Sequence, residues 1–395
     1  MQAPDTQYAV TDNGINIAYQ QFGKGPQNLI VIAGWVSNIE EIWNLHQFPS
    51  WILYLASFTK VIIYDRRGLG LSDKTAPNHM EDRIEDIKAI MQSLNINKAS
   101  FLGYCEGAAT ALYFAANYPD KVEKMIVSGG FAKLTQTDDY PIGQSQVESA
   151  RIVEQLLADW GQPNGLDLMA PSIMHYAGMP YAWAKFLRAS ASPSTAKSDL
   201  EMTQKIDVRH CLGQITVPVL ILHRKDDRLI SAAHSHYLQQ HIKGAQLLMP
   251  QGVDHLPWVK TNAVELSGIL TFLLDQQIVT VPDLSFEDFS KMYRIKAYLE
   301  KNQAQNVTIN QICKEFGLNE FKLKTGFKKL FKTTIRQYLK SYRLKTAIHL
   351  LTNTDMPLDE ISQKVGYVYA NNFSATFKSK FGCSPRQYRR THYRQ

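Results

Sequence analysis

Short, continuous apolar segments that alternate with helical segments constrain the fold of this chain more than any other feature. Five of them are NLIVIAG (28–34), VIIYD (61–65), ASFLGY (99–104), KMIVSG (124–129) and VPVLILH (217–223). Between them lie stretches with helical spacing, such as MEDRIEDIKAIMQSL (80–94). Continuous apolar strands separated by helices are typical of a mainly parallel sheet that is buried on both faces. The sequence therefore predicts an α/β fold with a doubly wound sheet.

The net charge of the chain changes sign at a proline-containing segment, QQIVTVPDLS (276–285). From residue 283 onward there are 21 Lys and Arg against 9 Asp and Glu, a net charge of +12, whereas residues 1–282 have 22 against 27, a net charge of −5. A chain of 395 residues is also too long for one ordinary core. We therefore predict a domain at 1–275, a linker at 276–286 and a basic domain at 287–395. The basic block is either a solvated surface or a surface for nucleic acid.

The four cysteines are widely spaced, at Cys105, Cys211, Cys313 and Cys383, and they form neither a disulfide framework nor a cluster with zinc spacing. No apolar run reaches the ~18 residues that a membrane span requires. The first residues, MQAPDTQYAV, lack the pattern of a signal peptide. We expect a cytoplasmic protein that uses no metal, no cofactor and no membrane.

The stretch GYCEG (103–107) has the spacing of a nucleophile elbow, the tight strand-to-helix turn that presents a catalytic side chain in many hydrolases. The turn strains its central residue and leaves room only for tiny neighbours, which Gly103 and Gly107 provide. Cys105 then takes the position of the nucleophile. A thiol beside a histidine attacks carbonyl carbons well and leaves a thioester, whose hydrolysis needs a positioned water.

An acid and a histidine follow later strands, in the expected chain order. Asp226 and Asp227 come directly after VPVLILH, and His255 follows QLLMP. Taken alone, each has an ordinary explanation as a turn residue or a structural histidine, and Cys105 as a small buried hydrophobe. Together, at successive strand ends, they predict a triad.

With these motifs, residues 8–275 resemble the α/β-hydrolase family. The run Asp227-Arg228-Leu229-Ile230 is similar to the family's pattern after the acid, and Gly252-Val253-Asp254-His255-Leu256-Pro257 is similar to its pattern around the base. The resemblance implies that Cys105, Asp227 and His255 are the catalytic residues.

The same resemblance describes the surroundings of the pocket. It implies an oxyanion hole formed by the backbone N–H groups of Trp35 and Glu106, with Trp258 beside the pocket. The family's His-Gly turn appears here as Ala33-Gly34. Residues 131–205 have no strand pattern and resemble the family's helical cap. Their aromatic and methionine content favours a mostly apolar ligand.

Two segments of the basic half, 308–331 and 357–381, share one plan of helix, glycine turn and helix. In the first, Thr308 and Gln311 predict a capping box and Gly317 ends the helix. A long helix over 334–351 joins the two segments. The pattern predicts an all-α domain with two helix-turn-helix units.

This half resembles the AraC/XylS family of transcription regulators over residues 287–392, most closely at FGCSPRQYRR (381–390). The resemblance implies binding to double-stranded DNA. Asn371 and Asn372 would face the groove, where their amides can pair with adenine. The remaining DNA-binding residues expected on this basis, which face outward or suit phosphates, are Lys322, Lys324, Thr325, Lys328, Lys329 and Lys378.

Three functions fit this combination. The first is a transcription regulator, expected as a homodimer, whose hydrolase-like domain senses a small acyl, ester or lactone compound, with covalent attachment to Cys105 as one mode. The second is an active Cys-His-Asp hydrolase fused to a DNA-binding domain. The third is a structural scaffold with an inactive pocket that only mediates dimerisation. It explains why a cysteine stands where a hydrolase of this architecture normally carries serine, but not the presence of both Asp227 and His255.

Overall fold

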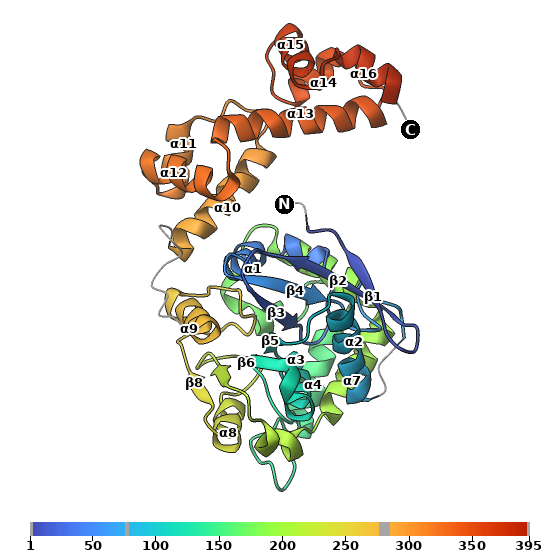
Figure 1. Ribbon diagram of the computed structural model, residues 1–395, viewed down its shortest axis with the longest axis vertical. Helices are drawn as coiled ribbons and strands as arrows, with labels where there is room; N and C mark the ends of the chain where they lie inside the picture. Colours follow the sequence, from blue (N-terminus) through green and yellow to red (C-terminus); the bar gives the residue numbers. More distant parts are fainter. Residues whose placement is uncertain (1–2, 76–78, 276–284, 393–395) are drawn as a thin grey trace. The chain divides into compact units, whose positions relative to one another are not determined.

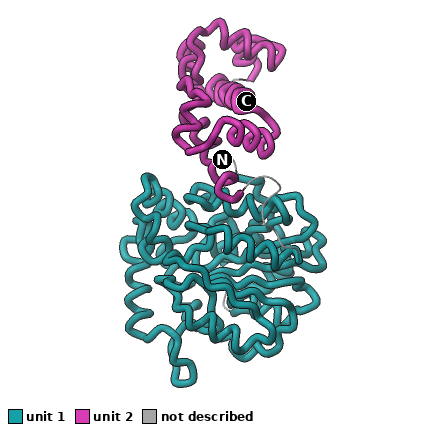
Figure 2. The backbone as a smooth tube through the Cα atoms, turned by 90° about the vertical axis from the view of Figure 1, so that its left-hand side faces the viewer, with its two compact units in different colours: residues 1–280 teal, residues 281–395 magenta. Residues whose placement is uncertain are grey.

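The computed structural model describes residues 3–75, 79–275 and 285–392. The chain divides into two compact units, residues 1–280 and 281–395 (Figure 2). The predicted linker spans this division, and residues 276–284 of it lie outside the described residues. No helix of the described ranges has both the length and the hydropathy needed to cross a membrane.

An eight-stranded sheet forms the centre of the first unit, in the order β1-β2-β4-β3-β5-β6-β7-β8 (Figure 1). All neighbours from β4 to β8 are parallel, whereas β2 is antiparallel to both β1 and β4. The strands are β1 (Gln7–Val10), β2 (Asn16–Phe22), β3 (Gln27–Ile32), β4 (Thr59–Tyr64), β5 (Ala99–Tyr104), β6 (Val122–Ser128), β7 (Val219–Leu222) and β8 (Gln246–Leu248). The five predicted strands are β3 to β7, so the mainly parallel sheet is confirmed.

Helices cover both faces of this sheet (Figure 1). They are α1 (Phe48–Leu55), α2 (Met80–Ser93), α3 (Glu106–Asn117), α4 (Gln146–Leu157), α5 (Leu166–Met169), α6 (Met179–Ser190), α7 (Pro193–Lys205), α8 (Ala233–His241) and α9 (Ala263–Leu274). Short 3-10 helices are η1 (Glu41–Asn44), η2 (Pro119–Lys121), η3 (Pro171–Ile173) and η4 (Arg209–Gln214). We call residues 131–205, which contain α4 to α7 and no strand, the cap segment.

Helix α3 is almost entirely buried against the sheet, and many of its side chains are small. Ten of its twelve residues are buried, among them Ala108, Ala109, Ala111 and Ala115. Alanine lets the helix backbone approach the sheet closely without a gap in the packing. The start of α3 is therefore held firmly at the end of β5.

The second unit is entirely helical in its described part. Its helices are α10 (Phe286–Lys301), α11 (Ile309–Phe316), α12 (Glu320–Phe331), α13 (Ile335–Asn353), α14 (Leu358–Lys364), α15 (Ala370–Phe381) and α16 (Pro385–His392). The predicted capping box of Thr308 and Gln311 begins α11, and Gly317 ends it with a φ of +60°. The pairs α11–α12 and α14–α15 are the two predicted helix-turn-helix units.

Each helix-turn-helix unit has a small hydrophobic core of its own. The first core includes Leu323 and Phe327 of α12, and the second includes Phe373 and Phe377 of α15. Helix α13 contributes to both, with Ile335 in the first and Leu344 among others in the second. The two helix-turn-helix units are therefore joined by one continuous helix, α13, rather than by a loop.

Candidate functional site

Cys105 lies in the sharp turn between β5 and α3, as the elbow motif predicts. Its φ of 54° and ψ of −128° are unusual for a residue with a side chain, so the surrounding structure must hold it there. A Cβ at Gly103 would lie 2.6 Å from the carbonyl oxygen of Gly107, and one at Gly107 would lie 2.3 Å from that of Ile32. Glycine at both positions therefore has a steric cause.

We expect Gly107→Ala to lower the free energy of unfolding by about 1–3 kcal/mol, because the added methyl group collides with backbone of β3 that cannot move aside. Urea denaturation of the full-length protein measures the effect. Gly213→Ala is the matched control, since a Cβ there would have no atom within 4 Å. Equal stability of both variants would contradict the close approach of α3 to β3.

Asp227 and His255 form a hydrogen-bonded pair at the ends of neighbouring strands. The distance from His255 Nδ1 to Asp227 Oδ2 is 2.8 Å. The other carboxylate oxygen, Asp227 Oδ1, accepts hydrogen bonds from the backbone N–H of Leu229 at 2.9 Å and of Ile230 at 3.1 Å. Asp226 is exposed instead. The structure therefore brings Asp227, and not Asp226, to the histidine.

Charge dominates the ionisation of this pair. Burial alone would lower the pKa of His255, but the negative charges of Asp227 and of a Cys105 thiolate outweigh burial and raise the pKa to about 10. Burial would raise the pKa of Asp227, yet the neighbouring His255 holds it below its ordinary value. The negative charge of Asp227 therefore favours the imidazolium form of His255.

A narrow apolar cavity opens beside Cys105 and His255. The space within it that the centre of a water molecule can occupy is about 20 Å³, which is enough for one water or two. The residues around it are Gly34, Trp35, Val36, Tyr104, Cys105, Met169, Trp183, Phe186, His255, Leu256 and Trp258. Cys105, Trp35 and Trp258, expected beside the pocket, are thus brought together there. The side chain of Glu106 is not among them.

Two buried indole nitrogens of the cavity residues, Trp35 Nε1 and Trp258 Nε1, have no hydrogen-bond partner among the described residues. A buried N–H group without a partner costs free energy, so such groups are normally satisfied by a water or a ligand. The walls of the cavity are apolar, and its unpaired polar groups are N–H groups that require an acceptor.

The cap segment is tied directly to the loop that carries His255. The backbone N–H groups of His255 and Leu256 both donate to the carbonyl oxygen of Met169, at 3.0 and 3.1 Å. Ser172 donates to the buried carboxylate of Asp254, from its backbone N–H at 2.9 Å and from its Oγ at 2.7 Å. Sequence reasoning missed these contacts.

Of the cap's aromatic and methionine side chains, Met169, Trp183 and Phe186 line the cavity. Trp160 packs edge-on against Trp35, with ring centroids 5.7 Å apart. Tyr181 is 72% exposed and faces away. The expected apolar lining therefore comes from only some of the cap's aromatic and methionine side chains.

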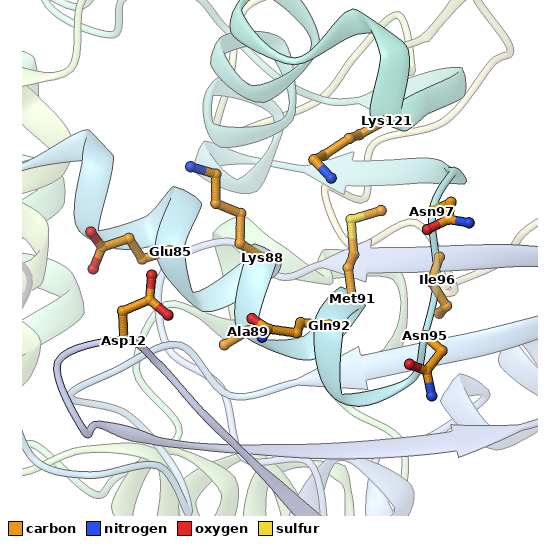
Figure 3. Close-up of a pocket in the computed structure, with 10 residues that line it drawn as sticks. All are labelled: Asp12, Glu85, Lys88, Ala89, Met91, Gln92, Asn95, Ile96, Asn97 and Lys121. Carbon is orange, nitrogen blue, oxygen red and sulfur yellow. The ribbon is translucent and has the colours of Figure 1, made fainter.

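A larger hollow, of about 430 Å³, lies beside α2 at the amino-terminal ends of β5 and β6 (Figure 3). Polar side chains from α2, including Glu85, Lys88 and Gln92, line it together with Lys121. Residues 95–97 and Lys121 precede β5 and β6, whereas Cys105 follows β5. This hollow is therefore remote from Cys105. Within the ranges that the structure describes, no group of three or more His, Cys, Asp or Glu could hold a metal ion.

The residues expected to contact DNA lie on the outer sides of α12 and α15. Asn371, Asn372 and Lys378 are exposed on α15. On α12, the exposed residues are Lys322, Lys324, Thr325 and Lys328, whereas Lys329 is half-buried. Lys322 Nζ lies 3.1 Å from Asp288 and Lys324 Nζ 2.5 Å from Glu320, so both would have to exchange partners to bind a phosphate.

Exposed apolar side chains also stand at the start of both helices, which the sequence reasoning missed. Phe321 is 76% exposed at the start of α12, and Val368 and Tyr369 are 83% and 67% exposed just before α15. Their position could have been read from the helix phase, because Leu323 and Phe327 fix the inner face of α12.

Comparison with known proteins identifies two families in one chain. Residues 27–259 match the family model for the alpha/beta hydrolase fold. Residues 312–391 match the model for a helix-turn-helix domain, of the AraC type.

Similar curated proteins match part of the chain. A pimeloyl-[acyl-carrier protein] methyl ester esterase of Neisseria meningitidis is 26% identical over 235 residues, which are 59% of this chain and 88% of that protein. The human serine hydrolase BPHL is 28% identical over 262 residues, 64% of this chain and 81% of that protein.

Solved structures show the same fold. A bromoperoxidase from Bacillus anthracis has a TM-score of 0.58 at 21% identity, covering 69% of this chain and 100% of its own. An enol-lactonase from Burkholderia xenovorans LB400 has a TM-score of 0.55 at 20% identity, covering 68% and 99%. The chain therefore belongs to the α/β-hydrolase fold family, and it carries an AraC-type helix-turn-helix domain in addition.

Proposed function

We propose that this protein is a transcription regulator that binds double-stranded DNA through residues 287–395 and senses a small, mostly apolar acyl, ester or lactone compound through residues 1–275. One observation carries the proposal: Cys105, the Asp227–His255 pair and an apolar cavity come together in a chain that also has a helix-turn-helix domain. A pocket with reactive groups on a DNA-binding chain is suited to reporting a reactive ligand.

The proposed sensing step is acylation of Cys105. The thiolate attacks the carbonyl carbon of the ester, a C–S bond forms, and the bond from that carbon to the leaving oxygen breaks. The proton on His255 Nε2 passes to the leaving alkoxide, so a neutral imidazole and a neutral thioester remain. With a lactone the ring opens and the whole ligand stays attached. A slow deacylation would make this adduct a lasting signal.

The chemistry of the cavity supports this ligand class. Met169, Trp183 and Phe186 offer apolar walls, and the unpartnered N–H groups of Trp35 and Trp258 offer donors to a carbonyl or carboxyl oxygen. One similar protein is named a methyl ester esterase, which agrees with an ester in this pocket.

The second unit offers a two-part surface for the DNA. Asn371 and Asn372 can pair with adenine in the major groove, and the exposed Phe321, Val368 and Tyr369 can contact thymine methyl groups. Lys328 and Lys378 supply charge for phosphates. We propose that the regulator acts as a homodimer, so that four helix-turn-helix units read one operator.

Hydrolysis is the second candidate function, because one similar curated protein is named an esterase and another a serine hydrolase. It would require that a water in the cavity, activated by His255, releases the acyl group from Cys105 in every turnover. A thioester that forms and does not accumulate would favour this alternative over the sensor.

The proposed function is tested by selecting sequences bound by the full-length protein from random duplex DNA and then measuring affinity for the selected duplex with and without an acylating ester. We expect specific binding and a change in affinity, of about fivefold or more, that disappears in Cys105→Ala. In a footprinting experiment on the selected duplex, a homodimer should protect twice the length of DNA that one chain covers. No retention of duplex DNA at low salt would refute the regulator.

A further inference from the structure

Next to Cys105, the side chain of Glu106 enters a buried group of charged and polar side chains that we call the Glu106 cluster. It consists of Arg66, Arg83, Glu106, Asp199 and Thr203. Glu106 Oε1 lies 2.5 Å from Arg66 NH1 and 2.7 Å from Arg83 NH1, and Glu106 Oε2 accepts a hydrogen bond from Thr203 Oγ1. Arg66 NH2 also lies 3.2 Å from Asp199 Oδ2.

Stability alone does not explain this cluster. The four charged side chains are at most 5% exposed. Burying ions costs several kcal/mol each, which pairing in the interior often only offsets. Burial opposes the charged form of Glu106, but Arg66 and Arg83 lower the pKa of its carboxyl below the usual value, so it stays an anion. A buried ionic group of this kind fixes geometry more than it adds stability.

The Glu106 cluster contacts the two backbone segments on either side of the Cys105 thiol. Arg66 binds the Glu106 carboxylate with NH1, and with NH2 it donates to the backbone carbonyl oxygen of Trp35. Trp35 and Glu106 are the two residues whose backbone N–H groups are the candidate oxyanion donors. Trp35 has a φ of 38° and Cys105 a φ of 54°, and such strained residues keep their conformation only where neighbours hold them.

We propose that Arg66 and Glu106 are positioning residues for acylation of Cys105, which together hold the two oxyanion donors at the distance that a tetrahedral intermediate requires. This inference rests on the proposed function, because it needs a carbonyl compound as the reagent. Donors that are positioned in advance are worth about 10²–10³ in rate each. Neither side chain touches the reacting atoms.

The cap segment completes this assembly. Asp199 and Thr203 both come from helix α7, so one partner of Arg66 and one partner of Glu106 are present only while α7 stays packed in place. Acylation should therefore depend on the cap, whereas a thiol reaction that develops no oxyanion should not.

Two reactions of Cys105 in the full-length protein separate positioning from general damage. Acetylation by p-nitrophenyl acetate passes through an oxyanion, and alkylation by iodoacetamide is a displacement at a CH₂ group that does not. Both are followed by mass spectrometry of the Cys105 peptide, at concentrations where the rates rise linearly. Arg66→Lys keeps the charge but loses the forked contact with both loops. We expect it to lower acetylation about 10–100-fold and alkylation less than threefold.

Glu106→Gln and Asp199→Asn are measured beside it, because they are milder changes at the same buried contacts. Each should lower acetylation relative to alkylation, with the smaller effect for Asp199→Asn. Arg67→Lys is the matched control: Arg67 is an equally buried arginine in the same loop, but it pairs with Asp82 and Asp86. Its ratio of the two rates should equal that of the wild type.

The outcomes are distinct. A ratio that stays unchanged in all three cluster variants, or that falls as much in Arg67→Lys, would overturn the positioning role and leave the proposed function intact. Alkylation without any acetylation in the wild type would overturn the proposed function and the oxyanion hole with it.

Discussion

Incubation of the full-length protein with p-nitrophenyl acetate should add one acetyl group to Cys105, and His255→Ala should slow this addition by about 10²–10⁴-fold. The histidine removes the proton from the thiol and later protonates the leaving group, and general acid–base catalysis of this kind contributes that factor. Intact-mass measurement against time gives the rate. Asp227→Asn should slow it as well, because the carboxylate that orients His255 Nδ1 is lost.

The other cysteines are internal controls for this result. Burial raises the pKa of the Cys211 thiol to about 11, so it carries little thiolate at neutral pH and should stay unmodified. Cys105→Ala should abolish the adduct. If the label spreads evenly over the four cysteines, or if His255→Ala changes nothing, then the triad is unused and any sensing is non-covalent.

Release of the acyl group separates a sensor from an enzyme. An adduct that outlasts removal of the ester by many minutes agrees with sensing, whereas continuous production of p-nitrophenol with little adduct indicates turnover. Cys105→Ser extends the test, because a complete triad and oxyanion hole could give that variant esterase activity.

Asn371→Ala should cost about 1–3 kcal/mol of binding free energy at one base position of the selected duplex and relax the base preference there. The amide of Asn371 is exposed near the start of α15, where it can reach an adenine edge. Asn372→Ala should act at a neighbouring position. Affinities for duplexes substituted at each position, measured by fluorescence anisotropy, give the profile.

Lys328→Ala should behave differently, since a phosphate contact positions the protein without reading sequence. We expect weaker binding to all duplexes alike and a salt slope that is smaller by about one. Lys197→Ala, an exposed lysine on α7 in the first unit, is the matched control and should leave the slope unchanged. A base-specific loss in Lys328→Ala would contradict the division of roles between the two residues.

Much of the fold follows from sequence patterns that depend on neighbouring residues alone. Strands β3 to β7 are continuous apolar runs, and the helix-turn-helix units have caps and glycines at fixed spacings. Strand β2 was not predicted, because Gln20 and Gln21 interrupt its apolar pattern. Gln20 is nevertheless buried, since its side chain bonds with Trp43 Nε1 and Thr6 Oγ1, and such distant partners leave no trace in the local pattern.

The candidate site divides in the same way. The order of Cys105, Asp227 and His255 is visible in the chain, because each follows a strand. The Glu106 cluster is not visible, because Arg66, Arg83 and Asp199 are brought to Glu106 only by the folded sheet and cap. Two signals were available: a charged residue directly after the nucleophile, within an apolar turn, and the stretch YDRRGLGLSD (64–73), which resembles a family pattern whose Asp65 and Arg66 usually brace the active-site loops. The size of the cavity depends on how side chains pack and could not be predicted.

The carbonyl of Met169 that binds the backbone N–H groups of His255 and Leu256 has a consequence for the timing of any response. The cavity leaves only about 20 Å³ for the centres of water molecules, so we expect the cap segment to move, and these hydrogen bonds to break, when an ester enters. Adduct formation would then stop accelerating at high ligand concentration, once opening of the cap limits the rate. Opening also frees the loop that carries the base, so the reaction waits until the cap closes again. The protein would thus respond at a pace set by its own motion rather than by the abundance of the ligand.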